Sequence, residues 1–122
     1  MKYLLAIIFL ISLAGVIKDK RDKLTLSDSS QTLFSGQKVQ LGNSSFSPLY
    51  LHVFKYEEKG SLKHVNLTDA LKGVVMRIES FELFEEEGIS VWLAYLTQHN
   101  DDNTYVCEIE AALKTKEIIL LK

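Results

Sequence analysis

The chain has 122 residues, which is enough for one domain after a leader is subtracted. With 47% hydrophobic and 25% charged residues, it has the composition of an ordinary globular protein, which excludes global disorder. A net charge of -2 argues against nucleic acid as a partner, because nucleic-acid binding calls for a basic face. The single cysteine, Cys107, excludes an internal disulfide.

The N-terminal segment has the layout of a secretory signal peptide. Lys2 precedes an apolar run from Tyr3 to Leu13, and the small residues Ala14 and Gly15 follow it as candidate cleavage sites. The apolar run is shorter than the roughly 20 residues that a membrane-spanning helix needs. We therefore expect export, with the domain secreted or held at the cell surface. A leader retained as a signal anchor is the alternative, and membrane attachment is expected only in that case.

Residues 1–15 are assigned to the signal peptide, and residues 16–122 are expected to form one all-β domain. From Leu24 onward the apolar residues recur with a period of two, which indicates strands rather than helices. Polar and glycine-containing turns separate these runs at intervals of roughly 8 to 12 residues, which is typical of small sandwich domains. The stretch 65–73 fits either a short helix or a loop. The expected strands are 24–26, 38–41, 49–56, 74–84, 89–96, 105–110 and 117–121.

One strand carries a specific motif, in which Asp101 is followed by Tyr105 and then by Cys107. This pattern resembles the sixth strand of an immunoglobulin variable-type domain. In such domains the Tyr closes a corner by bonding back to the backbone, and the Cys faces the opposing sheet. The resemblance implies an immunoglobulin-like β-sandwich of two antiparallel sheets. It also implies an ion pair between Asp101 and Arg77, which opens the strand at 74–84.

The likeness extends over most of the domain. The runs 105–110 and 117–122 resemble the last two strands of the integrin-associated protein and of the T-cell costimulatory receptors. Residues 90–96 resemble the fifth strand of the costimulatory receptors, and residues 34–41 resemble the approach to a variable-domain second strand. The class that the resemblance implies is an immune-receptor-like recognition domain.

Three departures from the immunoglobulin pattern limit what the resemblance implies. The second-strand Cys is replaced, because steps of two from Val39 lead to Asn43, which is then expected to face Cys107 across the two sheets. The third-strand Trp is replaced by Val53. The proline-rich ligand loop of the costimulatory receptors is missing from residues 111–114. No family ligand site is therefore carried over to this chain.

The sequence contains no catalytic arrangement. His52, His64 and His99 are scattered, and each is expected to be a surface, turn or packing residue. Cys107 is expected to be a buried thiol rather than a nucleophile, and the run Glu85–Glu87 a solvated turn rather than a cation site. Neither a Gly-x-Ser-x-Gly elbow nor a metal-ligand spacing of Cys and His is present. We therefore expect a protein that is not an enzyme and that uses no cofactor or metal.

Two glycosylation sequons begin at Asn43 and Asn66. Asn66 lies in an expected loop and is the better acceptor. Asn43 is expected to face inward, where a glycan does not fit. The two sites agree with an exported glycoprotein.

The expected function is binding of a partner protein, such as a cell-surface receptor or ligand. Tyr50, Phe54 and Tyr56 are the aromatic side chains expected on the binding face. Viral mimicry of a host immune receptor would explain a minimal domain that lacks the usual Cys and Trp.

A cystatin-like protease inhibitor is the alternative from a different class of function. Residues 70–96, the polar turn after them and the strand of Tyr105 can be laid onto the antiparallel hairpins of that fold. The inhibitory Gln-x-Val-x-Gly wedge is replaced by Glu85–Gly88, however, and no long helix precedes the strands. Papain-type proteases would be the targets in that case.

Overall fold

The computed structural model describes residues 17–26, 30–56 and 64–121. The predicted signal peptide lies outside the described residues. No helix in the described ranges is long and apolar enough to cross a membrane. The helical elements are a 3-10 turn, η1 (Asp69–Leu71), and the helix α2 (Ile109–Lys114). The strands are β1 (Ile17–Arg21), β2 (Lys23–Thr25), β3 (Thr32–Phe34), β4 (Lys38–Leu41), β5 (Leu49–Tyr56), β6 (His64–Thr68), β7 (Val75–Glu86), β8 (Ile89–Thr97), β9 (Tyr105–Glu108) and β10 (Ile118–Leu120).

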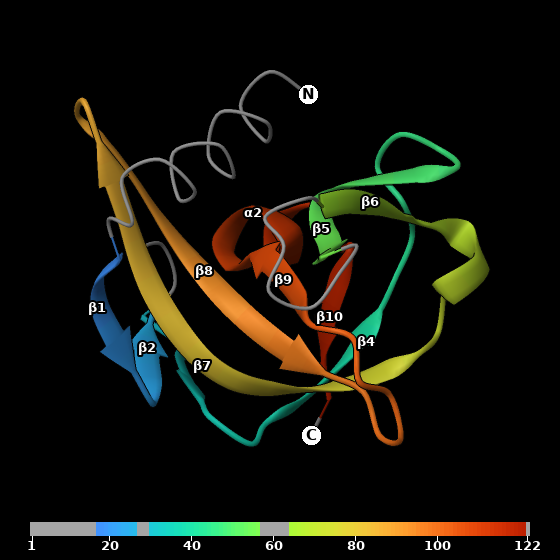
Figure 1. The fold of residues 1–122 in the computed structure, drawn as a ribbon, viewed down its shortest axis with the longest axis horizontal. Helices are drawn as coiled ribbons and strands as arrows, with labels where there is room; N and C mark the ends of the chain where they lie inside the picture. The colour runs from blue at the N-terminus through green and yellow to red at the C-terminus, as the bar shows by residue number, and fades with distance from the viewer. Residues whose placement is uncertain (1–16, 27–29, 57–63, 122) are drawn as a thin grey trace.

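The predicted all-β class is confirmed, and every strand pair is antiparallel. One sheet has the order β10-β4-β7-β8-β9-β5-β6, with β1 also paired to β7, and β2 and β3 form a separate two-stranded sheet. Figure 1 shows the long β7–β8 hairpin curving across the molecule, with β1 and β2 at one end and β5 and β6 at the other. β1 and β4 pair with β7, and β9 pairs with β8, so this hairpin forms the middle of the large sheet.

The turn of the β7–β8 hairpin follows from its sequence. Glu86 pairs with Ile89, so Glu87 and Gly88 form a two-residue loop. Both loop residues have positive φ, +47° and +82°, as a tight hairpin turn requires to match the twist of its strands. Gly88 adopts this conformation without steric cost. The predicted acidic turn is therefore confirmed at its C-terminal end.

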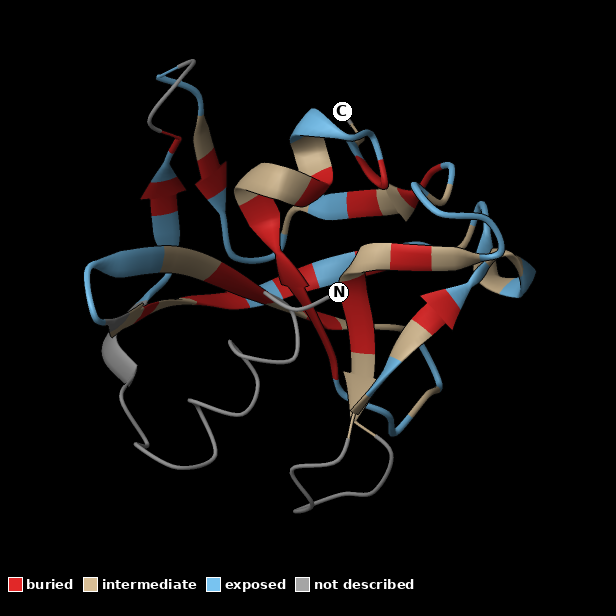
Figure 2. Ribbon diagram, turned by 90° about the horizontal axis from the view of Figure 1, so that it is seen from above, coloured by how far each residue is buried: buried red, intermediate tan, exposed pale blue. Residues whose placement is uncertain are grey.

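The central strands are buried on both faces, so two apolar clusters lie on opposite sides of the large sheet. Along β8, Ala94 and Leu96 belong to the larger cluster, which also receives side chains from α2, β10 and the β2–β3 hairpin. Leu93, directly before Ala94, belongs to the smaller cluster with Phe54 and Phe84, and Tyr95, between Ala94 and Leu96, packs against that cluster. Figure 2 shows the resulting bands of buried and exposed residues along the strands. Successive side chains of a strand point to opposite faces of the sheet, so β8 contributes apolar side chains to both clusters.

The helix α2 replaces the end of a predicted strand and a predicted loop. Its residues include Ala, Leu and Lys, which favour helices, and Ile109 and Ala112 are buried one turn apart. The helix ends where the Thr115 hydroxyl donates to the Ala111 carbonyl at 2.9 Å and Lys116 takes a φ of +64°. The prediction of a strand through residue 110 was wrong, because helix propensity and burial of one helical face outweigh the period of two.

Residues 65–73 were predicted to form either a short helix or a loop. In the structure they contribute to β6 and to the 3-10 turn η1. β6 ends at Thr68, whose hydroxyl accepts a hydrogen bond from the Ala70 N–H at 3.4 Å. The 3-10 turn η1 follows. Thr68 thus caps a single helical turn that leads back toward β7.

The pairing of β9 departs from the arrangement that the immunoglobulin resemblance implies. In a variable-type domain the strand before the Tyr-x-Cys strand lies in the opposite sheet. Here β8 and β9 are neighbours, with Ala94 opposite Cys107, and β5 lies on the other side, with Val53 opposite Cys107. The described strands therefore form one large sheet and a two-stranded ribbon.

A prediction concerns Gly42, which is buried directly after β4. A Cβ atom at this position would lie 2.2 Å from the Lys116 carbonyl oxygen. Gly42→Ala must therefore push the turn before β10 away, and we expect it to lower the free energy of unfolding by about 1–3 kcal/mol in urea denaturation. Asn43→Ala, an exposed neighbour, is the control and should change stability by less than about 0.5 kcal/mol. Equal stabilities of the two variants would contradict this close contact.

Candidate functional site

Tyr105 closes a corner with the side chain of Asp101, whereas the prediction had Tyr105 bonding back to the backbone and Asp101 pairing with Arg77. The Tyr105 hydroxyl donates to Asp101 Oδ2 at 2.6 Å, and the Asn103 N–H donates to Asp101 Oδ1 at 2.8 Å. These bonds lower the pKa of Asp101, while burial and then the Asp101 bond raise the pKa of Tyr105 to about 12. The predicted ion pair of Asp101 with Arg77 is not formed in the described part of the chain, because Arg77 lies exposed on β7 opposite Thr97. The hydrogen bonds of Asp101 therefore stabilise the turn before β9.

Cys107 is a free, buried thiol, as predicted, and its burial raises its pKa. The predicted position of Asn43 was wrong. β4 ends at Leu41, which is 1% exposed, and the chain leaves the sheet at Gly42, so that Asn43 is exposed to solvent. Asn43 therefore does not face Cys107.

The aromatic residues predicted to bind a partner are core residues instead. Tyr50 and Phe54 are both 0% exposed, and Tyr56 is partly buried beside Tyr95. The Tyr50 hydroxyl donates to the Gly42 carbonyl, and Phe54 packs edge-on against His64. β5 lies between β6 and β9 in the sheet, and its side chains enter both apolar clusters. The alternating pattern of β5 therefore does not leave one face of this strand exposed, because its side chains pack into both apolar clusters.

The two sequon asparagines differ in accessibility. Asn66 is half-buried in β6, and its Nδ2 donates to the Tyr50 carbonyl at 2.7 Å. Asn43 is exposed in the segment after β4. The geometry therefore favours Asn43 as the acceptor, in the reverse order to the prediction.

A wholly buried carboxylate, which the sequence did not indicate, joins three segments of the chain. Glu117 is 0% exposed and lies just before β10. Its Oε2 accepts the N–H groups of Ser45 at 2.9 Å and Leu51 at 2.8 Å, and its Oε1 accepts the N–H of His52 at 2.8 Å. Hydrogen bonds to a charged group contribute about 1.5–3 kcal/mol each. Glu117 therefore fixes the segment between β4 and β5 to the C-terminal strand.

His52 and Glu108 form a second polar contact close to this carboxylate. His52 Nδ1 lies 2.8 Å from Glu108 Oε1, and the two side chains are 23% and 9% exposed. The hydrogen bond to Glu108 raises the pKa of His52, against the effect of partial burial. His52 is therefore not the quiet residue that was predicted. No group of three or more metal-ligating side chains is present among the described residues.

The charge state of His52 gives a prediction for pH. Because its pKa in the folded state lies above its usual value of 6.5, its stabilising contribution is complete below that value and is lost as pH rises through the folded pKa. Urea midpoints should fall from pH 6 to pH 8, and His52→Gln should remove this part of the slope. His99→Gln, at an exposed turn, should leave it unchanged. An identical slope in the wild-type protein and in His52→Gln would refute this coupling.

An aromatic cleft of about 660 Å³ lies between β1, the β2–β3 hairpin and β8. The Arg21 guanidinium stacks on Trp92, with its carbon 5.0 Å from the ring centroid. Phe34 lies at the same cleft and is 54% exposed. Asp22 and Lys23 add one charge of each sign. The cleft thus contains both the exposed Phe34 ring and the Arg21 guanidinium that lies over Trp92.

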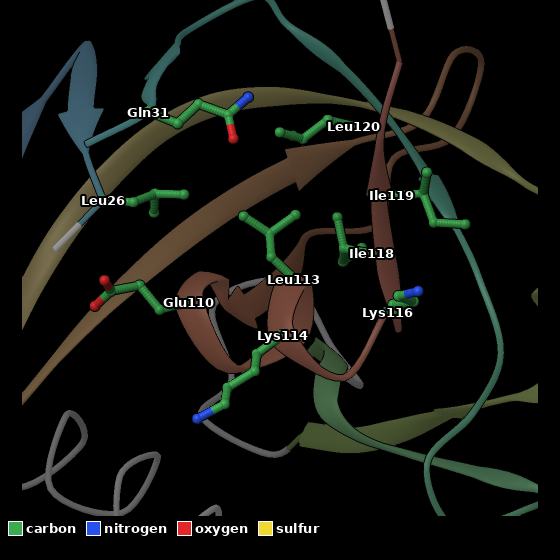
Figure 3. Close-up of a pocket in the computed structure, with 9 residues that line it drawn as sticks. All are labelled: Leu26, Gln31, Glu110, Leu113, Lys114, Lys116, Ile118, Ile119 and Leu120. Carbon is green, nitrogen blue, oxygen red and sulfur yellow. The ribbon is translucent and has the colours of Figure 1, made fainter. Parts of the chain in front are cut away.

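A second cleft, of about 570 Å³, lies between α2, β10 and the β2–β3 hairpin. Its polar residues are Gln31, Glu110, Lys114 and Lys116, and its apolar lining is Leu26, Leu113, Ile118, Ile119 and Leu120. Figure 3 shows Leu26, Leu113 and Leu120 directed toward a common space. Sequence reasoning missed both clefts, because each is assembled from segments far apart in the chain.

In comparisons with protein-family models, curated proteins and solved structures, the chain matches none of them. We therefore infer function from the two clefts and from the residues that line them.

Proposed function

We propose that this chain is a secreted or surface-tethered recognition domain that binds a partner protein through the aromatic cleft. The observation that carries the proposal is the exposed ring of Phe34 at the same cleft as the Arg21–Trp92 stack. Trp, Tyr and Arg dominate the residues that contribute most to protein–protein affinity, and Phe is also enriched at interfaces. A large apolar ring left half in water gains the most from such burial.

The partner that this cleft suits presents an apolar side chain next to a carboxylate. The apolar group would cover Phe34 and the exposed part of Trp92. The carboxylate would approach Arg21, whose guanidinium carbon lies over the Trp92 ring, 5.0 Å from the ring centroid. Preorientation lowers the entropy that is lost when the complex forms.

The class that we propose is an immunoglobulin-like recognition domain, with immune modulation, including viral mimicry of a host receptor, as its setting. Support comes from the antiparallel all-β fold, the Asp101–Tyr105 corner and the buried Cys107. The export layout of residues 1–15 supports action outside the cell. The neighbouring positions of β8 and β9 are the departure from this class.

The cystatin-like alternative gains no support from the described residues. Their one α-helix has six residues and follows β9, whereas the inhibitor fold needs a long helix before its sheet. The loop at the tip of the β7–β8 hairpin carries Glu87 and Gly88 in place of an inhibitory wedge. Tight inhibition of a papain-type protease would restore that alternative.

The proposed function predicts a loss of binding when the exposed ring is removed. Screening the exported protein against a library of cell-surface proteins should identify a partner, and Phe34→Ala should weaken that complex at least tenfold, or about 1.4 kcal/mol. Arg21→Gln should weaken it as well, because it removes the oriented cation.

Phe46→Ala is the matched control. Phe46 is 63% exposed, in the segment between β4 and β5, and does not line the cleft. It should leave the dissociation constant unchanged, as measured by surface plasmon resonance. A partner that tolerates Phe34→Ala but loses affinity with Phe46→Ala would place the binding site elsewhere.

A further inference from the structure

A third cleft, of about 450 Å³, lies where β4, β7 and the end of β8 are side by side in the large sheet (Figure 1). Its volume is within the range of small-molecule sites. Two cations and three uncharged polar side chains that can donate hydrogen bonds contribute to it, and none of the described residues that line it is a carboxylate. The full lining is Lys38, Val75, Met76, Arg77, Thr97, Gln98 and His99. The cleft therefore suits an anion.

The strand register brings the two cations together. Lys38 and Arg77 are directly opposite each other in the β4–β7 pair. In the neighbouring pair of residues the Ile78 N–H donates to the Gln37 carbonyl at 2.9 Å. Hydrogen-bonded and non-hydrogen-bonded pairs alternate along antiparallel strands, so Lys38 and Arg77 form a non-hydrogen-bonded pair, with Cα atoms about 4.5 Å apart. Their side chains thus start from the closest positions that two strands offer.

Lys38, Arg77 and Thr97 share one face of the sheet. The strand neighbours Val39 and Met76 are buried in the larger apolar cluster, and successive side chains of a strand point to opposite faces. Thr97 is directly opposite Arg77 in the β7–β8 pair. Two cations and a hydroxyl therefore form a row across three neighbouring strands, on the face away from the larger cluster.

Neither cation of this row has a hydrogen-bond or ion-pair partner for its side chain among the described residues. Both side chains are exposed. Like charges directly opposite each other in an antiparallel pair are destabilising. An anion between Lys38 and Arg77 would replace this repulsion by two attractions.

We propose that this cleft binds a phosphate monoester, with the phosphate group between Lys38 and Arg77. At pH 7 such a group carries a charge of about −1.5 to −2, which matches two adjacent cations, whereas a carboxylate or a sulfate ester carries a single charge. The Arg77 guanidinium can donate two parallel hydrogen bonds to phosphate oxygens, and the Thr97 hydroxyl is a further donor. Val75, which is 44% exposed at the same cleft, offers an apolar surface to the group that carries the phosphate. None of these residues lines the aromatic cleft, so phosphate binding stands or fails separately from partner binding.

The test compares phenyl phosphate with phenyl sulfate, which have nearly the same shape but carry about two charges and one charge at pH 8. In isothermal titration calorimetry of the exported protein at constant ionic strength, phenyl phosphate should bind with a stoichiometry of one at about millimolar concentration, and phenyl sulfate at least about fivefold more weakly. Inorganic phosphate should also bind more weakly than phenyl phosphate, because it lacks the ring that would cover Val75.

Variants of the row locate the binding. Lys38→Gln/Arg77→Gln should weaken phenyl phosphate binding at least about tenfold, and Thr97→Val at least about threefold. Lys114→Gln/Lys116→Gln is the matched control, because it removes the same charge from two exposed lysines outside this cleft, and it should bind as wild type does. Circular dichroism spectra should show that all three variants keep the fold.

The proposal is overturned if phenyl phosphate does not bind at tens of millimolar concentration, or if Lys38→Gln/Arg77→Gln binds it as well as the control variant does. Equal affinities for phenyl phosphate and phenyl sulfate would refute a ligand group with two charges. Equal affinities for phenyl phosphate and inorganic phosphate would show that the free ion, rather than an ester, is the ligand, and would also overturn it.

Discussion

The structure depends on one buried charge. The Glu117 carboxylate accepts three backbone N–H groups and has no exposed surface. Two of the donors, Leu51 and His52, are consecutive in β5, although successive N–H groups of a regular strand point in opposite directions. The pairing of β5 with β6 changes register between Leu49 and Phe54, which allows both groups to face the carboxylate. A buried carboxylate without these donors would destabilise the fold by several kcal/mol.

This contact also helps to position the residues of the second cleft, between α2, β10 and the β2–β3 hairpin. Glu117 follows Lys116 directly and begins the approach to β10, whose side chains line the cleft. At the other end of α2, Glu108 bonds to His52, the residue whose N–H donates to Glu117. The helix is therefore held at both ends by polar groups of one network. Support of this kind fixes the positions of the side chains that this short helix contributes to the second cleft.

The sequence predicted those features that a single strand pattern encodes. The all-β class follows from the period of two, and the burial of the Cys107 thiol follows from its place in an alternating strand. Patterns could not show that β5 and β9 are buried on both faces, because an alternating strand reads as half exposed. For this reason Tyr50 and Phe54 were assigned to the wrong place. Glu117 was missed because its donors are more than sixty residues away in the chain.

Amide hydrogen exchange at Ser45 tests the role of Glu117 most directly. Ser45 is exposed and lies outside the strands, and its N–H donates to the Glu117 carboxylate at 2.9 Å. We expect this amide to exchange at least about 100-fold more slowly than in an unstructured peptide, and to lose most of this protection in Glu117→Gln. Exchange of the Ser45 amide at the rate of an unstructured peptide in the wild-type protein would contradict the account.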